Sequence, residues 1–231
     1  MASELSSYPS ASCCGGDCEP TSFDDLPSDR VCEALFTHVH GFLSPEMSAR
    51  LFEAGLKGIP FDGAYHCSCS TTYPRAVFNF EDVDQVRRLS DDFSAVIDMV
   101  TAEISRRLGS SYQCIQIWAN HYRTHSDFTP EHQDSAPGQV IACLSLGGER
   151  ILTTRPLPGI EGSLREWMIR SGDLYFFNSV FNLTHLHGVP RMSGTLPEAS
   201  SRISLILFLK NTFTEGIEEE FEEDVADLMG L

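Results

Sequence analysis

The 231-residue chain contains no long uninterrupted apolar segment. A membrane-spanning helix needs roughly 20 consecutive apolar residues, and no run approaches that length, so no membrane association is expected. The first residues, MASELSSYPSASCCGG, have neither the basic start nor the apolar block of a secretory signal, and we expect an intracellular protein, cytoplasmic or nuclear. With 42% hydrophobic and 10% aromatic residues, the composition is nevertheless that of a globular protein.

Basic residues are also scarce, since 16 Lys and Arg stand against 33 Asp and Glu, for a formal net charge of -17. A uniformly acidic protein would repel phosphate backbones. The acidity lies mainly at the two ends, however: residues 1–30 carry a net charge of -5, residues 212–231 carry -8, and residues 31–211 carry only -4. We therefore expect a flexible acidic N-terminal arm (1–30), one globular domain (31–211) and an acidic C-terminal tail or helix (212–231).

Paired metal-binding cysteines are missing although the chain has eight cysteines. Cys67-x-Cys69 has the wrong spacing to complete a zinc site begun by Cys13, Cys14 and Cys18, so a structural metal there is only a minor alternative. Without a secretory signal, reduced thiols are expected in place of a disulfide framework.

Two helical patterns precede a series of short strands. Apolar residues at helical spacing predict helices over 45–56 and 83–108, with a hairpin or long loop over 59–80 between them. After Gly109 the period changes, and β-rich segments follow over 113–119, 139–146, 150–154, 165–170, 173–178, 183–189 and 202–209. This order predicts an α+β fold, a β-sandwich or jelly-roll barrel backed by N-terminal helices. A helical pattern over 215–228 indicates a docking helix or a solvated tail.

One neighbourhood has the residue types of a metal site. In an extended segment His132 and Asp134 point to the same side, and two further imidazoles follow at His185 and His187. Two imidazoles and one carboxylate form the facial triad of non-haem Fe(II) oxygenases, which leaves positions open for other ligands. Residues two apart in a strand share a face, so spacing does not choose between His185 and His187. The alternative is a surface histidine followed by a turn-forming aspartate.

Arg202 opens an otherwise apolar strand, with Ser204 two residues further on. A buried guanidinium needs a counter-charge, which a small dicarboxylate or a neighbouring acidic side chain would supply. Asn120 and Tyr122 precede His132 and offer an amide and a phenol to the same ligand, unless they are an ordinary strand end.

In combination and order, these motifs resemble the AlkB-like branch of the 2-oxoglutarate/Fe(II) dioxygenases. The resemblance covers about residues 112–210 and rests on Asn120-x-Tyr122, Asp127, His132-x-Asp134, His187-Gly-Val-Pro190 and Arg202-x-Ser204. It implies a double-stranded β-helix in which Fe(II) is held by His132, Asp134 and His187, and 2-oxoglutarate by Arg202, Asn120 and Tyr122. Asn is more usual in this branch at the position of Ser204, which resembles the Arg-x-Ser pattern of other branches, and its hydroxyl is expected to help bind the same co-substrate. Dioxygen would be the co-substrate of a hydroxylation or oxidative demethylation. The Gly-Val-Pro after His187 matches the family pattern and favours His187 over His185.

The resemblance weakens at the substrate positions. Nucleic-acid demethylases of this family carry an acid where this chain has Ala136, and commonly a second arginine where it has Phe208. Tyr73-Pro-Arg75, followed by Phe78, loosely resembles the Pro-Arg element of the repair members, which makes Tyr73, Arg75 and Phe78 candidate substrate contacts; a small satellite core is the alternative. We rank an alkylated nucleobase first, a protein side chain or small molecule second, and a non-catalytic interaction module third.

Overall fold

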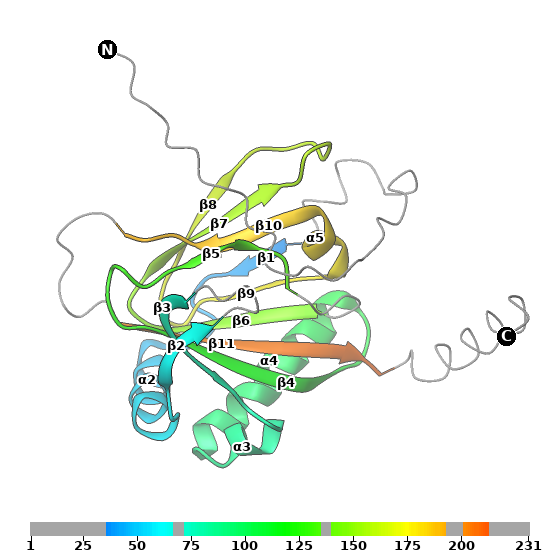
Figure 1. The fold of residues 1–231 in the computed structure, drawn as a ribbon. Coiled ribbons are helices and arrows are strands. Elements are labelled where there is room, and N and C mark those ends of the chain that lie inside the picture. The colour runs from blue at the N-terminus through cyan, green and yellow to red at the C-terminus, as the bar shows by residue number, and fades with distance from the viewer. Residues whose placement is uncertain (1–35, 67–71, 135–139, 193–200, 213–231) are drawn as a thin grey trace, which may run out of the picture.

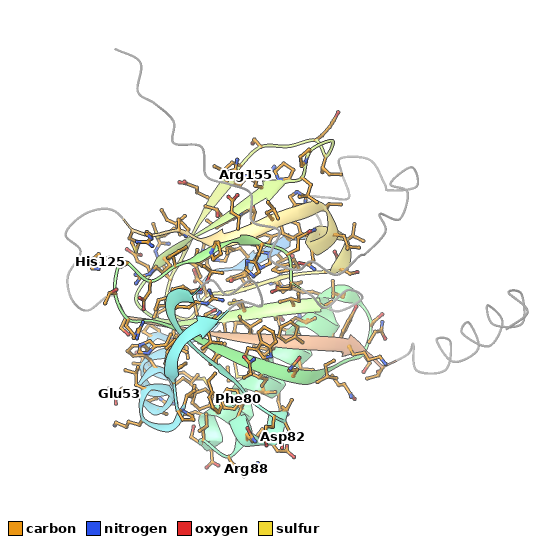
Figure 2. All side chains as sticks on the ribbon, viewed as in Figure 1. Glu53, Phe80, Asp82, Arg88, His125 and Arg155 are labelled. Carbon is orange, nitrogen blue, oxygen red and sulfur yellow. The ribbon has the colours of Figure 1, made fainter. Side chains whose placement is uncertain are left out.

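The computed structural model describes residues 36–66, 72–134, 140–192 and 201–212. The arm predicted over 1–30, the helical pattern over 215–228 and Ala136 lie outside the described residues. The described elements form three layers: helices, a seven-stranded sheet and a four-stranded sheet (Figure 1). In Figure 2, Phe80 lies on the helix side of the larger sheet and Arg155 on the smaller sheet.

The larger sheet is antiparallel, with the strand order β1-β9-β6-β11-β4-β3-β2. Its strands are β1 (Phe36–Val39), β2 (Asp62–His66), β3 (Thr72–Asn79), β4 (Tyr112–Tyr122), β6 (Val140–Gly147), β9 (Leu174–Phe177) and β11 (Arg202–Asn211). The smaller sheet has the order β5-β10-β7-β8 and consists of β5 (Thr129–His132), β10 (His185–Val189), β7 (Arg150–Pro156) and β8 (Arg165–Ile169). Every strand predicted from the sequence is present, and β2 and β3 pair as a hairpin, one of the two alternatives expected for residues 59–80.

Strand β11 shows how alternation separates an apolar layer from the site. Ile203, Leu205 and Leu207 belong to the core between the sheet and the helices, whereas Phe208 belongs to the second core between the two sheets. Because successive side chains of a strand point to opposite faces, Arg202 and Ser204 share the inner face with Phe208. The polar residues at the start of β11 therefore point into the barrel.

The described helices that precede β4 cover the outer face of the larger sheet (Figure 1). As predicted, α2 (Pro45–Gly58) starts at Pro45, and the Ser44 side chain caps it by accepting a hydrogen bond from Met47 N at 3.2 Å. The single helix predicted over 83–108 is wrong, because the segment divides into α3 (Val83–Arg87) and α4 (Asp91–Leu108). Ser90 is extended and caps α4 by accepting from Phe93 N at 3.2 Å. The apolar period continues across the break, which conceals it in the sequence.

A short helix, α5 (Ser179–Thr184), precedes β10 and was not predicted from the sequence. The strand predicted over 183–189 consequently begins at His185. Asn178 caps α5 by accepting a hydrogen bond from Phe181 N at 3.1 Å. In the described part of the chain, no helix combines the length and the apolar character that crossing a membrane requires.

Candidate metal centre

His132 and His187 face each other across two paired strands of the smaller sheet. His132 ends β5 and lies directly opposite His187 of β10, with the ring centroids 4.4 Å apart. Directly opposed residues of antiparallel strands have neighbouring side chains, so strand pairing alone brings the two imidazoles together.

Asp134 places its carboxylate between these imidazoles. Its Oδ1 lies 3.4 Å from His132 Nε2, and its Oδ2 lies 3.3 Å from His187 Nε2. The buried Asn182 of α5 holds the backbone of Asp134: Asp134 N donates to Asn182 Oδ1 at 2.9 Å, and Asn182 Nδ2 donates to Asp134 O at 2.8 Å. Asn182 therefore orients Asp134 without occupying its carboxylate oxygens.

The electrostatics of the cluster suit a cation. Burial raises the pKa of Asp134, but the charges of His187 and His132 and the hydrogen bonds from them outweigh burial and hold this pKa well below its ordinary value. The carboxylate is thus ionised at neutral pH. Burial, together with the charge of His132, lowers the pKa of His187 against the opposing effect of Asp134. A neutral imidazole and an ionised carboxylate are the forms that bind metals.

The tautomer of His132 points the same way. Its Nδ1 lies 3.0 Å from the carbonyl oxygen of Pro130, which can only accept a hydrogen bond, so Nδ1 carries a proton. In the neutral ring, Nε2 is then the nitrogen with a free lone pair, and it faces Asp134 Oδ1 at 3.4 Å, where a metal ion could bind both atoms. The three ligand atoms lie within 4.8 Å of one another, and the donor set is that of a facial triad. The residues fit a divalent first-row metal.

His185 lies outside this cluster although it shares a strand with His187. Its ring stacks on Phe181 of the preceding helix, with the centroids 4.3 Å apart, and its Nδ1 lies 2.9 Å from Thr184 Oγ1. His185 directly follows α5, so its side chain packs against that helix. The geometry thus brings His187, and not His185, to His132 and Asp134, and the role of the three residues as metal ligands stays a prediction.

Arg202 is a buried cation on the inner face of the larger sheet, the face that is turned toward the smaller sheet. Its residue is 1% exposed, and its Nε donates to Ser145 Oγ at 2.8 Å. Within the described residues, Nη1 is buried without a hydrogen-bond partner, and no carboxylate forms an ion pair with the guanidinium. An uncompensated guanidinium is unfavourable in a low-dielectric interior, whereas a bound carboxylate would both neutralise it and satisfy Nη1.

Tyr122 connects Arg202 to the strand that carries His132. It lies opposite Arg202 in the β4–β11 pairing, and the guanidinium carbon is 5.3 Å from the centre of its ring. The Tyr122 hydroxyl lies 2.6 Å from Oγ1 of Thr129, the first residue of β5. Tyr122 therefore links the arginine to β5, the strand that ends at His132 of the His–Asp–His cluster.

The other predicted co-substrate contacts have protein partners on the same inner face. Asn120 lies opposite Ser204, and its Oδ1 accepts a hydrogen bond from Arg75 Nε at 3.3 Å. Ser204 Oγ lies 2.6 Å from Cys143 Sγ. Their roles in binding 2-oxoglutarate stay predictions.

The candidate substrate contacts do not form one exposed surface. Arg75 is 7% exposed, and Phe78 packs against Phe80 in the core beneath the helices, with ring centroids 4.8 Å apart. Tyr73 lies in β3, and its side chain is outside the described part of the structure. Phe208 is buried and packs against Trp118, with the ring centroids 5.1 Å apart. Phe78 thus packs against the main core, and the roles of Tyr73, Arg75 and Phe78 in substrate binding stay predictions.

The structure adds polar residues that the motifs did not identify. Cys143 and Ser145 occupy alternate positions of the apolar strand β6, and that period of two is a signal the sequence contained. Thr129 and Asn182 carry no comparable signal, because their partners Tyr122 and Asp134 are recognisable only after folding.

No family model and no curated protein matches the chain. Among solved structures, an oxidoreductase of the 2OG-Fe(II) oxygenase family from Burkholderia pseudomallei superposes with a TM-score of 0.57 at 14% identity, covering 79% of this chain and 91% of that one. The chain has the double-stranded β-helix fold of 2-oxoglutarate/Fe(II) oxygenases. This confirms the α+β jelly-roll expectation.

Two further structures share this oxygenase fold. OsALKBH1 matches with a TM-score of 0.54 at 16% identity, over 74% of this chain and 96% of its own. A Pseudomonas putida prolyl-4-hydroxylase matches with a TM-score of 0.50 at 17% identity, over 76% of this chain and 92% of its own. At these identities the likeness concerns the fold, whereas function has to be argued from the site.

Proposed function

We propose that the protein is a non-haem Fe(II)- and 2-oxoglutarate-dependent dioxygenase that hydroxylates or oxidatively demethylates its substrate. One observation carries the proposal: Tyr122 links the uncompensated buried cation of Arg202 to the strand that ends at His132 of the His–Asp–His cluster. The three cluster residues would hold Fe(II). Arg202 and the hydroxyl group of Ser145 would bind the distal carboxylate of 2-oxoglutarate.

Bound Fe(II) and 2-oxoglutarate would together supply the oxidising chemistry, in which dioxygen is activated for attack on a substrate C–H bond. The protein orients its own groups for this. The Tyr122 ring lies against the guanidinium of Arg202, and Asn182 fixes the backbone of Asp134. Phe177 packs on His187 with ring centroids 4.9 Å apart and keeps water from that side of the cluster.

Absorption spectroscopy tests the proposal. Anaerobic addition of Fe(II) and 2-oxoglutarate should give the weak visible charge-transfer band of such centres, and succinate should form once dioxygen is admitted. Asp134→Ala and His187→Ala should abolish both signals, while His125→Ala, a histidine outside the cluster, should retain them. A wild-type protein with neither band nor succinate would instead support the non-catalytic interaction module.

As substrate we propose an alkylated nucleobase, which rests on the motif order resembling the AlkB-like branch. OsALKBH1, whose name marks an AlkB homologue, is among the structural neighbours. Succinate formation should then rise with oligonucleotides that carry methylated bases and not with their unmethylated counterparts.

Two observations favour a second candidate, a protein side chain or a small molecule. Arg75 hydrogen-bonds to Asn120 inside the barrel, so this cation is withdrawn from a phosphate backbone at the surface. Phe208 places an apolar ring where the demethylases commonly have an arginine. One neighbour is a prolyl-4-hydroxylase by name. Proline-containing peptides that stimulate succinate formation, with oligonucleotides inactive, would select this candidate.

A further inference from the structure

A second group of two histidines and one aspartate lies at an edge of the larger sheet. His38 is in the edge strand β1, His40 follows that strand, and Asp173 immediately precedes β9. His38 Nε2 lies 3.0 Å from Asp173 Oδ2, and His40 Nδ1 lies 3.4 Å from the same oxygen. All three ligand atoms fall within 4.8 Å of one another, as in the first cluster. We call these residues the edge cluster.

Strand pairing and one turn assemble the edge cluster. β1 and β9 are antiparallel, with His38 opposite Tyr175, which brings the segment before β9 beside the histidines. The ring centroids of His38 and His40 lie 3.9 Å apart. Gly41, with a φ of 58°, turns the chain so that its N–H donates to Asp173 Oδ1 at 2.8 Å.

Hydrogen bonds hold the carboxylate of Asp173 in place, as they do for carboxylates that bind metals. Arg170 N donates to Asp173 Oδ2 at 2.9 Å, so backbone donors hold both carboxylate oxygens. Hydrogen bonds of this outer kind orient ligating carboxylates in metal sites. The side chains of His38 and Asp173 are 6% and 4% exposed, whereas that of His40 is 65% exposed, which leaves an approach from solvent on the His40 side.

We propose that His38, His40 and Asp173 bind a divalent ion of the Zn²⁺, Co²⁺ or Ni²⁺ class, with water completing the coordination. This site shares no residue with the proposed oxygenase centre and does not depend on its function. Bonds of about 2.0–2.2 Å in a tetrahedron separate ligand atoms by roughly 3.3–3.6 Å, close to the 3.0 and 3.4 Å found here. Imidazole and carboxylate together suit this group of ions. On binding, the ion replaces the hydrogen bond between His38 and Asp173.

Metal stoichiometry tests the proposal. Chelator-treated full-length protein is titrated with Co²⁺ and, separately, Zn²⁺, with equilibrium dialysis and the visible Co²⁺ spectrum as readouts. The double variant His132→Ala/Asp134→Ala, which lacks the first cluster, should keep one equivalent at the edge cluster. Adding His40→Ala should lower the affinity for that equivalent at least tenfold, and His125→Ala should leave it unchanged. His40 is exposed, so its replacement leaves the core packing intact.

Two results would overturn the edge site: no bound ion in the double variant, or an ion that persists after both His40→Ala and His38→Gln. A Co²⁺ spectrum with intense thiolate bands would assign the ion to cysteines and count against the site too. If the double variant fails to fold, His40→Ala alone should remove one of two equivalents from the otherwise unchanged protein. Loss of oxygenase activity affects none of these readouts, so the two proposals fail separately.

Discussion

The molecule contains two clusters of the same three residue types, and they differ in what else the aspartate does. At His132, Asp134 and His187, the carboxylate oxygens face the imidazoles, while Asn182 takes the hydrogen bonds of the Asp134 backbone. At the edge cluster, Asp173 uses its oxygens to accept the N–H groups of Gly41 and Arg170. The first carboxylate is available to a ligand, and the second also holds two segments of chain together.

The difference indicates how to tell a group that only binds a ligand from one of the same chemistry that also supports the fold. A buried charge that the protein leaves unsatisfied, such as Arg202, costs stability unless a ligand compensates it. A buried charge that accepts backbone hydrogen bonds stabilises the fold. Removing the first kind should impair function but not the apo fold, whereas removing the second kind should impair the fold.

The largest effect is expected for Asp134→Ala. It removes the anionic ligand of the proposed centre, so Fe(II) affinity and succinate formation should fall by more than about 100-fold. This loss exceeds the one usually found for residues that hydrogen-bond to a metal ligand without contacting the metal. The melting temperature of the metal-free protein should change little, because the substitution loses the pairing with two imidazoles but also removes the cost of burying the carboxylate charge. Calorimetry on chelated protein measures this. A large drop in the melting temperature would contradict the distinction between the two aspartates.

Arg202→Met should weaken 2-oxoglutarate binding by about 100-fold, because the guanidinium is the cation proposed to pair with its distal carboxylate. The apo protein should be as stable as wild type or more so, since an apolar chain replaces an uncompensated charge. Titration of the anaerobic visible band gives the affinity, with Arg155→Met, a half-exposed arginine paired to Glu131, as the matched control. Unchanged 2-oxoglutarate affinity would show that another group binds the carboxylate.

Asp173→Asn should instead lower the free energy of unfolding by about 1–3 kcal/mol at pH 7, because buried backbone donors lose a charged acceptor. Urea unfolding with and without chelator measures the loss and separates it from metal binding at the edge cluster. If the variant is as stable as wild type in chelator, Asp173 has no structural role.

The stability difference between wild type and Asp173→Asn should also depend on pH. Burial raises the pKa of Asp173, but the hydrogen bonds from Arg170, Gly41 and His38 outweigh burial and lower this pKa. A lowered pKa means that the carboxylate stabilises the fold above its ordinary pKa near 4 and loses that contribution as the pH falls through its value in the folded protein. The stability difference between wild type and Asp173→Asn should therefore be full at pH 7 and shrink below about pH 4. A difference that stays constant down to pH 2 would contradict this assignment.

The smallest effect is expected for Asn182→Ala, which leaves all three proposed ligands in place. Losing the two hydrogen bonds to the Asp134 backbone should reduce Fe(II) affinity about tenfold. This is the lower end of the range for residues that hydrogen-bond to a metal ligand. The Co²⁺ spectrum of the first cluster should change, whereas that of the edge cluster should not. Equal changes at both clusters would indicate a general loss of structure.

Much of the fold could be predicted because the strands and helices carry strong periods. Alternation along β6 and β11 and the apolar stripe of α4 are properties of contiguous sequence. The break between α3 and α4 escaped prediction, because the Ser90 cap competes locally with a period that continues across it. For the site, His-x-Asp and Arg-x-Ser spacing indicated residues on a shared face, but spacing could not separate His185 from His187.

By itself, the sequence determined most of the order of helices and strands, the alternation of faces along strands such as β6 and β11, and the residue types available for an Fe(II) and 2-oxoglutarate site. Only the tertiary structure decided which of those groups meet and which remain unsatisfied. His38 and Asp173 are 135 residues apart and become neighbours through the pairing of β1 with β9. Long-range contacts and burial arise when the sheets close, and burial is what makes an unpaired charge costly or a carboxylate available.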